Sequence, residues 1–525
     1  MLTALQTLIA AFARCERGNV LPMLAAALIP ILVTIGGGVD YARASLAQAK
    51  LQEAVDSAAL AGRRSMSQDN IETAKPQVNA FMRFNYPEAT YGTKPLDLQI
   101  TKPQPGVVRV QATTSIDTTL LALIGIDVWH IGAVGEATQN LDNVDIVLVL
   151  DTTGSMNDLN GGQRKIDALR KAVQSLYDEL APAQAQLRSQ NLRLRIGVVP
   201  YSSTVNIGKL LRAKNSSSIH EQNAKYYHWR NASGTWSFAQ RTYDLRNYVA
   251  GNTFGSPNGH SNFSSSRWKG CVEERATINT ITANDSRNAA PPEAWDLDID
   301  MLPGSDEKTR WQPYVFDPYN ADPNTYCPSQ VTLLADLNRS DIDRIVGELT
   351  PSGSTYHDIG MIWGTRIISG GGVFGTNNPS TYNGRPVTRH IIYMTDGLMS
   401  APMTSNETVN VCTQTFFFIC TASVNIANES LAYAGYGVEN RDRRVGGTSQ
   451  ADNEGRHTKR FLMACNAAKA KNVNVWTIAF GTGKVDSLTK CASNADQAYT
   501  VDNSNDLITK FSEIGRNLGA LRISK

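Results

Sequence analysis

The chain has 525 residues, room for roughly two to four domains, and its 50 lysine and arginine residues nearly balance 48 aspartate and glutamate residues. This balance gives no strongly basic surface, so we expect no nucleic-acid partner. The seven histidines are scattered and no Cys-x-x-Cys pair occurs, which argues against a structural zinc site.

An uncharged stretch at residues 18–39 is long enough to cross a bilayer once. Arg14 and Arg17 precede it and Asp40 is the first charge after it, so the positive-inside rule places residues 1–17 in the cytoplasm and the rest outside. A cleaved signal peptide is the alternative. We favour an uncleaved anchor, because the stretch is long for a signal peptide and the helical pattern continues past it.

Residues 40–62 have a strong helix composition without proline, so the anchor is predicted to continue outward as a helix. A loose apolar stripe runs along it: Leu46, Ala49, Leu51, Val55, Ala58 and Leu60. A membrane helix that continues as an amphipathic helix is how pilins are built, whereas a rigid stalk under an anchored domain fits equally well.

A small α+β module is predicted to complete residues 40–141. Its helix is expected at 71–84, and alternating apolar runs predict strands at 96–102, 107–116 and 130–139. The apolar segment 120–126 is compatible either with a strand or with a loop that packs on the anchor helix.

From residue 142 to 525, strands alternate with helices, which predicts an α/β domain with a doubly wound, mostly parallel sheet. The expected strands are 146–150, 192–202, 389–397, 473–481 and 498–502, and the expected helices are 165–180, 340–349, 358–369, 459–471 and a final one after 502. The first of these helices is expected to stop before Pro182. Two long segments, 208–330 and 398–456, interrupt the alternation and are interpreted as insertions.

Oxygen-bearing side chains follow three of the predicted strands and loops. Asp151, Thr153 and Ser155 come directly after the first strand, and Thr355 and Asp396 occupy two later loops. Carboxyl ends of parallel strands share one sheet edge, where open α/β sheets bind ligands. Carboxylate and hydroxyl oxygens suit Mg²⁺ first, with Mn²⁺ or Ca²⁺ as alternatives, and suit zinc poorly. Ordinary turn residues are the competing interpretation.

The three motifs DTTGS (151–155), GST (353–355) and TDG (395–397) resemble, in this order, the metal-ion-dependent adhesion site of von Willebrand factor A domains. The resemblance implies that Asp151, Thr153, Ser155 and Thr355 are metal ligands, and that Asp396 binds directly or through water. Thr153 stands where the commonest family form has serine, but it keeps the hydroxyl. In the family, a carboxylate from a protein partner completes the coordination.

The whole layout is similar to the TadG-type proteins of tight-adherence (Flp) pilus assembly. The anchor begins RGNVLPMLAA, and three further pieces add to the resemblance: residues 268–275, 353–369 and 498–524. The family implies a single-pass protein of the bacterial inner membrane, with a cytoplasmic amino terminus and a periplasmic or surface-exposed body. It also implies pilus or pilus-assembly proteins as partners.

Six of the seven cysteines fall outside the cytoplasm on this topology, which favours three disulfides. Nearness in sequence suggests Cys271–Cys327, Cys412–Cys420 and Cys465–Cys491, although fifteen pairings are possible. Buried free thiols are the alternative.

The segment between Cys412 and Cys420 contains the apolar run 415–419, Thr-Phe-Phe-Phe-Ile. It follows the strand that ends near Asp396, so it could lie near the metal face and contact a partner. Packing under the insertion is an equal alternative.

No catalytic motif supports an enzyme. The dehalogenase-type loop needs a second aspartate where Thr153 stands, and neither His-Glu-x-x-His nor Gly-x-Ser-x-Gly occurs. The sequence therefore predicts a non-enzymatic protein that binds partners through a metal in pilus assembly or anchoring. The alternative is a membrane-anchored surface adhesin that engages host or matrix ligands and takes no part in pilus assembly.

Overall fold

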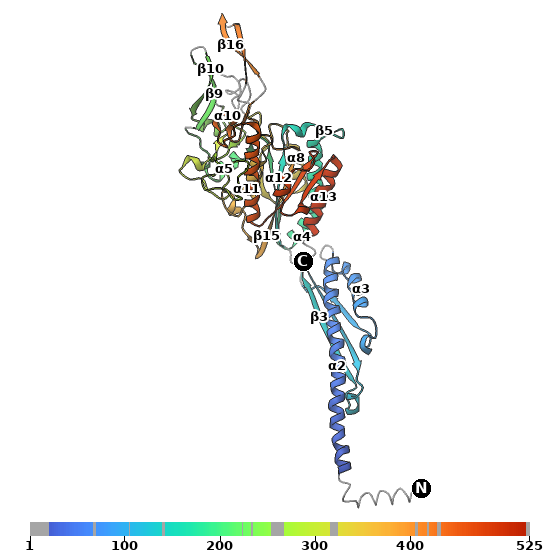
Figure 1. The fold of residues 1–525 in the computed structure, drawn as a ribbon. Coiled ribbons are helices and arrows are strands. Elements are labelled where there is room, and N and C mark those ends of the chain that lie inside the picture. Colours follow the sequence, from blue (N-terminus) through green and yellow to red (C-terminus); the bar gives the residue numbers. More distant parts are fainter. Residues whose placement is uncertain are drawn as a thin grey trace, which may run out of the picture. The chain divides into compact units, whose positions relative to one another are not determined.

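The computed structural model describes residues 20–66, 70–103, 106–138, 142–222, 224–232, 235–253, 267–315, 324–404, 408–416, 419–427 and 432–520. The chain divides into two compact units, Met1–Asn140 with Ala520–Lys525, and Leu141–Gly519. We call them the amino-terminal and the carboxyl-terminal unit and describe each by itself (Figure 1).

The amino-terminal unit is built on one long helix. Its main elements are α2 (Val20–Ser65), α3 (Lys75–Asn85), β1 (Asp97–Thr101), β2 (Val107–Asp117) and β3 (Val128–Thr138). The three strands form an antiparallel sheet in the order β1-β2-β3, which packs on the carboxyl-terminal half of α2. This arrangement confirms the predicted small α+β module on an extended helix.

The segment between β2 and β3 packs on α2, so the second of its two predicted forms is correct. It forms a short 3-10 helix, Leu121–Ile124. The Asp40 carboxylate accepts the backbone N–H groups of Thr119, Leu120 and Leu121 at 2.8–3.1 Å. A side chain at Gly36 would put its Cβ 2.4 Å from Leu120 Cβ, so only glycine permits this close approach.

The face that α2 buries matches the predicted stripe only in part: Leu51, Val55 and Ala58 are buried. Leu46 and Leu60 are each 58% exposed, whereas small residues such as Ala44 and Ala47 lie in the core with Leu51. Alanine has no bulky side chain to hold the sheet away, so the alanine-rich face packs against the strands. The stripe was predicted from hydrophobicity alone, which does not include this steric term.

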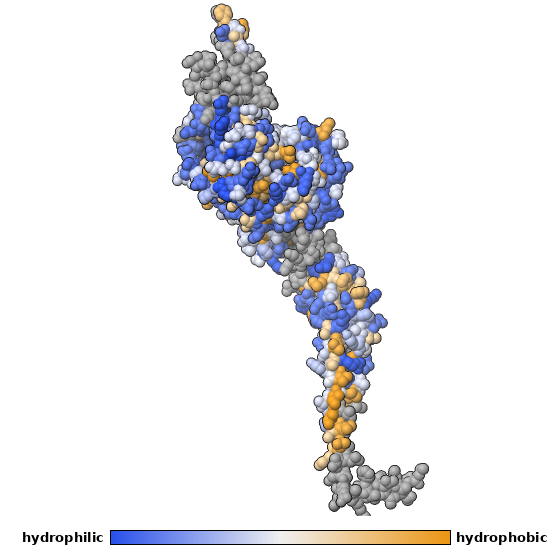
Figure 2. Space-filling view, viewed as in Figure 1, coloured by the Kyte–Doolittle hydropathy of each residue, from blue (hydrophilic) through white to orange (hydrophobic). Residues whose placement is uncertain are grey.

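One helix of the described residues, α2, is long and apolar enough to cross a membrane, by length and composition. Figure 2 shows apolar side chains gathered along the end of α2 that begins at Val20. Exposed members of this group are Met23, Leu24, Leu28, Ile31 and Ile35. Exposure of this kind is expected of a helix whose natural surroundings are apolar.

The carboxyl-terminal unit contains the predicted doubly wound, mostly parallel sheet. Its strands, in spatial order, are β13 (Thr332–Ala335), β7 (Leu194–Tyr201), β4 (Asn143–Asp151), β15 (Arg385–Thr395), β20 (Val473–Phe480) and β21 (Ala498–Val501). Neighbouring pairs in this order are parallel except β13 with β7. A short seventh strand, β14 (Thr381–Tyr382), pairs antiparallel with β15 outside this order. The antiparallel edge strand β13 is not among the strands predicted from the sequence.

Helices cover both faces of this sheet. Alternate residues of β4 point to opposite faces: Ile146 and Leu148 lie in one buried core, and Val147 and Val149 in the other. The first core includes α4 (Lys165–Ser189), α8 (Arg339–Gly347) and α13 (Ser504–Ala520), and the second includes α9 (His357–Ile368) and α11 (Gln450–Ala470). Burial on both faces explains the continuous apolar run of β4.

Two helix boundaries differ from the prediction. Helix α4 continues through Pro182 to Ser189, although Pro182 has no N–H to donate to the carbonyl of Asp178, a residue whose side chain is 58% exposed. Helix α11 begins at Gln450, inside the second insertion, and Ser449 caps it by accepting the N–H of Asp452.

Described residues of both insertions contribute to the core beside α9 and α11. Their main described elements are α5 (Gly208–Lys214), β9 (Ala224–Ala232), β10 (Thr235–Tyr243), β11 (Cys271–Glu273), β16 (Thr408–Phe416), β17 (Ile419–Ala427) and α10 (Glu439–Asp442). The motif at 268–275 joins them: Glu273 pairs with Arg444, and Glu274 pairs with the buried Arg366 of α9. This explains why that motif is rich in charge yet buried.

Candidate metal-binding site

The carboxyl ends of β4 and β15 bring the predicted site residues together. Strand β4 ends at Asp151, and a 3-10 turn, Gly154–Asn157, follows it. Strand β15 ends at Thr395, directly before Asp396. The two strands are parallel neighbours, so both loops leave the same sheet edge.

Four of the five predicted ligands are joined by short contacts. The Thr153 N–H donates to Asp151 Oδ1 at 2.8 Å, and the hydroxyls of Thr153 and Ser155 lie 3.0 Å apart. Ser155 Oγ donates to Asp396 Oδ1 at 2.8 Å. Two carboxylates and two hydroxyls from residues far apart in the sequence therefore share one small volume.

The loop that carries Thr355 reaches the same place through the backbone. The Gly154 N–H donates to the Gly353 carbonyl at 3.0 Å, and the Ser352 N–H donates to the Thr152 carbonyl at 2.8 Å. Thr355 is buried, and its hydroxyl would lie 3.7 Å from a Cβ placed on Gly397. Among the described residues, the Thr355 side chain makes no hydrogen bond to the other four predicted ligands, although its loop lies beside them.

Gly353 is required where the loop turns. Its φ of +80° lies in the left-handed region, and an added Cβ would come within 2.8 Å of Ser203 Oγ. A residue with a side chain would be strained here by both conformation and contact. The glycine of the GST motif therefore sets the position of Thr355.

Polar groups behind Asp151 hold its second oxygen. Thr395 Oγ1 donates to Asp151 Oδ2 at 2.6 Å, and the Tyr201 hydroxyl lies 3.5 Å from the same oxygen. Tyr393 in turn donates to the Tyr201 hydroxyl at 2.6 Å. His357 Nε2 lies 3.2 Å from Thr395 Oγ1, and burial lowers the pKa of His357 to about 4, so this imidazole is neutral at pH 7.

The surroundings of Asp151 disfavour the negative charge of its carboxylate. Burial and the neighbouring Asp396 carboxylate raise the pKa of Asp151 to about 7, against the hydrogen bonds from Thr395 and Thr153, which lower it. A carboxylate under such repulsion is stabilised by a nearby cation. The donor set and its charge therefore fit a hard divalent cation.

Lys165 is a residue of this site that the sequence reasoning missed. Its Nζ lies 2.9 Å from Asp396 Oδ2, and the lysine side chain is 12% exposed. Lys165 is the first residue of α4. Nothing in the local sequence distinguishes it from a solvent-exposed lysine at a helix start, because its role depends on the loop folding back toward β15.

Disulfides match two of the predicted pairings, Cys271–Cys327 and Cys465–Cys491. Cys420 is also disulfide-bonded. The side chain of Cys412 lies outside the described residues, so its pairing with Cys420 stays a prediction.

Phe416 and Ile419, two residues of the apolar run 415–419, form the last described pair of the β16–β17 hairpin (Figure 1). Phe416 is 67% exposed and Ile419 is 69% exposed. Phe417 and Phe418 lie outside the described residues. For the two described apolar residues, exposure at the tip contradicts packing under the insertion, whereas a contact with a partner stays a prediction.

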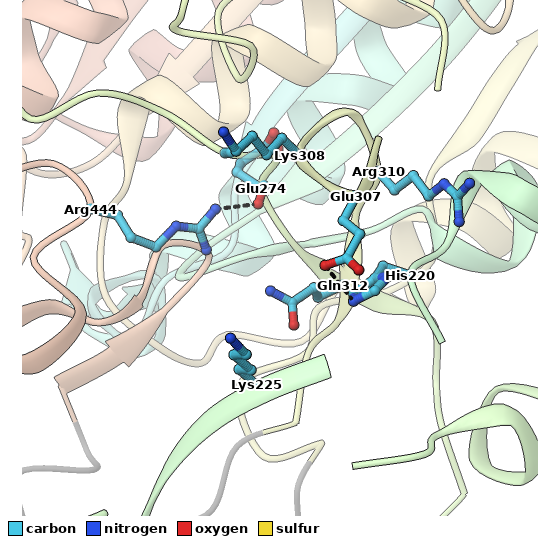
Figure 3. A pocket seen from close by; sticks show the side chains of 9 residues that line it. His220, Lys225, Glu274, Glu307, Lys308, Arg310, Gln312 and Arg444 are labelled. Atoms are coloured by element: carbon cyan, nitrogen blue, oxygen red, sulfur yellow. Dashed lines mark hydrogen bonds and ion pairs between the residues drawn. The ribbon is translucent and has the colours of Figure 1, made fainter. Parts of the chain in front are cut away.

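A charged cavity of about 210 Å³ lies in the insertions, between His220, Lys225, Glu274, Gln312 and Arg444 (Figure 3). Its charged groups largely engage protein atoms already. Arg444 binds Glu273 and two backbone carbonyls, and Glu307 lies 3.6 Å from His220. The cavity therefore has no evident need for a ligand, and we assign none.

We compared the chain with protein families, with curated proteins and with solved structures. Residues 18–65 match the family described as "Putative Flp pilus-assembly TadE/G-like". No curated protein matches the chain. Three solved structures resemble it at low identity, and they are described next.

The pilus adhesin SpaC from Lactobacillus rhamnosus GG aligns with 12% identity and a TM-score of 0.33, over 81% of this chain and 34% of SpaC. The vWF domain of the type V pili tip protein Mfa5 from Porphyromonas gingivalis aligns with 11% identity and a TM-score of 0.30, over 72% of this chain and 95% of that domain. Proximal thread matrix protein 1 from the mussel byssus was solved with a zinc-occupied MIDAS motif. It aligns with 12% identity and a TM-score of 0.20, over 72% of this chain and 96% of that protein.

The chain thus spans about a third of the length of SpaC, and likeness at this level assigns no function by itself. The sheet order and the polar loops at the ends of β4 and β15 give the carboxyl-terminal unit the doubly wound α/β fold that the resemblance to von Willebrand factor A domains implied. The amino-terminal segment 18–65 is TadE/G-like. The protein combines these two parts in one chain.

Proposed function

We propose that this protein is a non-enzymatic, membrane-anchored component of pilus assembly or anchoring, which binds protein partners through a divalent cation. The observation that carries the proposal is the convergence of Asp151, Thr153, Ser155 and Asp396 at one sheet edge. The TadE/G-like segment supports the pilus context.

The residues that would hold the cation are Asp151, Thr153, Ser155 and Thr355, with Asp396 binding directly or through water. All are oxygen donors, which favours Mg²⁺, with Mn²⁺ or Ca²⁺ as alternatives. When bound, such a cation supplies an electrophilic centre that attracts a carboxylate. Asp151 is held in place for this role by its hydrogen bonds from Thr153 and Thr395.

A partner with an exposed glutamate or aspartate would complete the site. Hydroxyl ligands carry no charge, so they leave more of the cation's charge available to an incoming carboxylate than a set of carboxylates would. The natural partners proposed here are pilus or pilus-assembly proteins.

The proposed location is the bacterial inner membrane. Helix α2 would cross it once, with residues 1–17 in the cytoplasm and the carboxyl-terminal unit in the periplasm or at the cell surface. The length and composition of α2 support this placement.

Cross-linking in the producing bacterium tests the proposal. The wild-type protein is expected to cross-link to pilus components, and both Asp151→Ala and chelation of divalent cations should abolish these products. The exposed Asp158→Ala, which removes a nearby carboxylate outside the proposed ligand set, serves as the control. Cross-links that persist in Asp151→Ala would contradict a metal-dependent contact.

The same experiment separates the alternative. A surface adhesin outside pilus assembly should give metal-dependent products with host or matrix ligands and none with pilus components.

A further inference from the structure

Lys165 occupies an unusual position for a lysine at the start of a helix. Its backbone N–H donates to the Asp158 carbonyl at 3.0 Å, which closes the loop that begins after Ser155. Its side chain then runs toward the sheet edge: the Cε atom lies 3.8 Å from a Cβ placed on Gly481, and Nζ lies 2.9 Å from Asp396 Oδ2. The ammonium therefore lies among the loops that follow β4, β15 and β20.

The ion pair is almost removed from water. The Asp396 side chain has no exposed surface and the Lys165 side chain is 12% exposed. Asp396 also accepts the Ser155 hydroxyl on its other oxygen. Both oxygens of Asp396 thus have protein donors, and among the described residues Lys165 is the one cation paired with a carboxylate of the site.

We infer that Lys165 is a built-in counter-ion of the metal site, which weakens the binding of a divalent cation alone and strengthens the binding of a partner carboxylate to the loaded site. This inference rests on the proposed metal-dependent function. It adds that Lys165 sets the affinity of the site for the cation, and it gives a reason why the loaded site favours a partner with a carboxylate.

The argument is a count of formal charges. With both carboxylates ionised, Asp151, Asp396 and Lys165 together carry one net negative charge. A bound divalent cation then makes the site positive by one, and a partner carboxylate neutralises it. Without Lys165 the two carboxylates alone neutralise the cation, and a partner carboxylate would leave a net negative charge in a desolvated place.

Two measurable effects of opposite sign follow. Removing the ammonium should tighten the binding of a divalent cation by about tenfold or more, because a like charge at short range is lost from a partly buried site. It should also reduce the coupling between the cation and a carboxylate ligand. A lysine that merely stabilises the fold would produce neither effect.

The test uses the 525-residue chain in detergent, with Mn²⁺ as the probe and electron paramagnetic resonance to measure free Mn²⁺. Titrations are run in sodium chloride and in sodium acetate of equal ionic strength. The variants are Lys165→Met, the charge-preserving Lys165→Arg and Lys171→Met, which removes an exposed lysine from the same helix. Circular dichroism and thermal unfolding of the metal-free proteins check the fold.

Lys165→Met should bind Mn²⁺ about tenfold more tightly than wild type, and the other two variants should stay within about threefold. Acetate should tighten Mn²⁺ binding in wild type and not in Lys165→Met. A wild type that binds Mn²⁺ beside a folded Lys165→Met with equal or weaker affinity would overturn the inference and leave the metal site intact.

Two further outcomes are also decisive. Absence of Mn²⁺ binding in every protein, with the fold kept, would overturn the metal site itself. If Lys165→Met does not fold, Lys165→Gln, which is neutral but can still donate to Asp396, replaces it. Loss of the fold in both variants would overturn the inference, because Lys165 would then serve the fold.

Discussion

Thr395 donates a 2.6 Å hydrogen bond to Asp151, so the last residue of β15 holds the carboxylate that ends β4. The two residues are 244 positions apart in sequence. This bond ties the orientation of the proposed first ligand to the strand that also positions Asp396.

Replacing Thr395 with valine should weaken Mg²⁺ binding about 10–100-fold, because an outer partner that orients a metal ligand is lost. The pKa of Asp151 should also rise further, since the Thr395 hydrogen bond lowers it. Calorimetry of Mg²⁺ binding at pH 7 measures the first effect. Thr395→Ser keeps the hydroxyl and should stay near wild type, and equal losses in both variants would argue against a role for this bond.

Replacing Asp40 with alanine should loosen the amino-terminal unit. Asp40 accepts three backbone N–H groups at Thr119, Leu120 and Leu121, and these donors would be left without a protein acceptor. The expected loss is about 2–3 kcal/mol of stability. Hydrogen exchange at 118–124 should accelerate strongly, whereas Glu53→Ala, on the exposed side of the same helix, should leave it unchanged. Unchanged exchange in Asp40→Ala would contradict this account.

The stability of the carboxyl-terminal unit should fall as the pH rises from about 6.5 to 10. His457 is buried between Asp358 at 2.7 Å and Glu439 at 3.3 Å. Burial alone would lower the pKa of His457, but the two carboxylates raise it to about 10. Its charged form therefore stabilises the fold fully below about pH 6.5, and this contribution is lost as the pH approaches 10.

The expected loss between pH 7 and 10 is on the order of 2–4 kcal/mol. Urea unfolding at several pH values measures it. His457→Gln should be less stable than wild type at pH 7 and should lack this dependence, whereas the exposed His130→Gln should keep it. The same slope in His457→Gln would assign the effect to other groups.

Non-reducing peptide mapping should find Cys420 linked to Cys412. Cys271, Cys327, Cys465 and Cys491 already form two bonds, which leaves Cys412 and Cys15 as possible partners of Cys420. A link from Cys420 to Cys15 would contradict both the pairing and the proposed topology. Removing the Cys465–Cys491 bond should cost about 2–4 kcal/mol.

The ends of strands were the most predictable part of the site. Apolar runs buried on both faces identify β4 and β15 without ambiguity, and the polar residue after each run then falls at the shared edge. This is why Asp151, Ser155 and Asp396 were placed together correctly from sequence. Two of the disulfides were predictable for a different reason, since nearby cysteines pair readily.

The remaining features depend on packing that sequence patterns do not encode. Lys165 reaches Asp396 because the loop after Ser155 returns to the sheet, and Pro182 lies inside α4 although a proline commonly ends a helix. The apolar stripe predicted along α2 is correct in part: Leu51, Val55 and Ala58 are buried, whereas Leu46 and Leu60 are exposed. Each of these features depends on how the segment packs against a neighbouring helix, strand or loop, which the pattern of residues within the segment does not encode.

The central claim is that this sheet edge binds a divalent cation. Calorimetric titration of Mg²⁺ into the 525-residue chain in detergent tests it most directly, alongside Asp151→Ala and the control Asp158→Ala. The account predicts one site in wild type and in Asp158→Ala, and loss of binding in a folded Asp151→Ala. Equal Mg²⁺ binding in wild type and Asp151→Ala, or no binding in any of the three folded proteins, would contradict it.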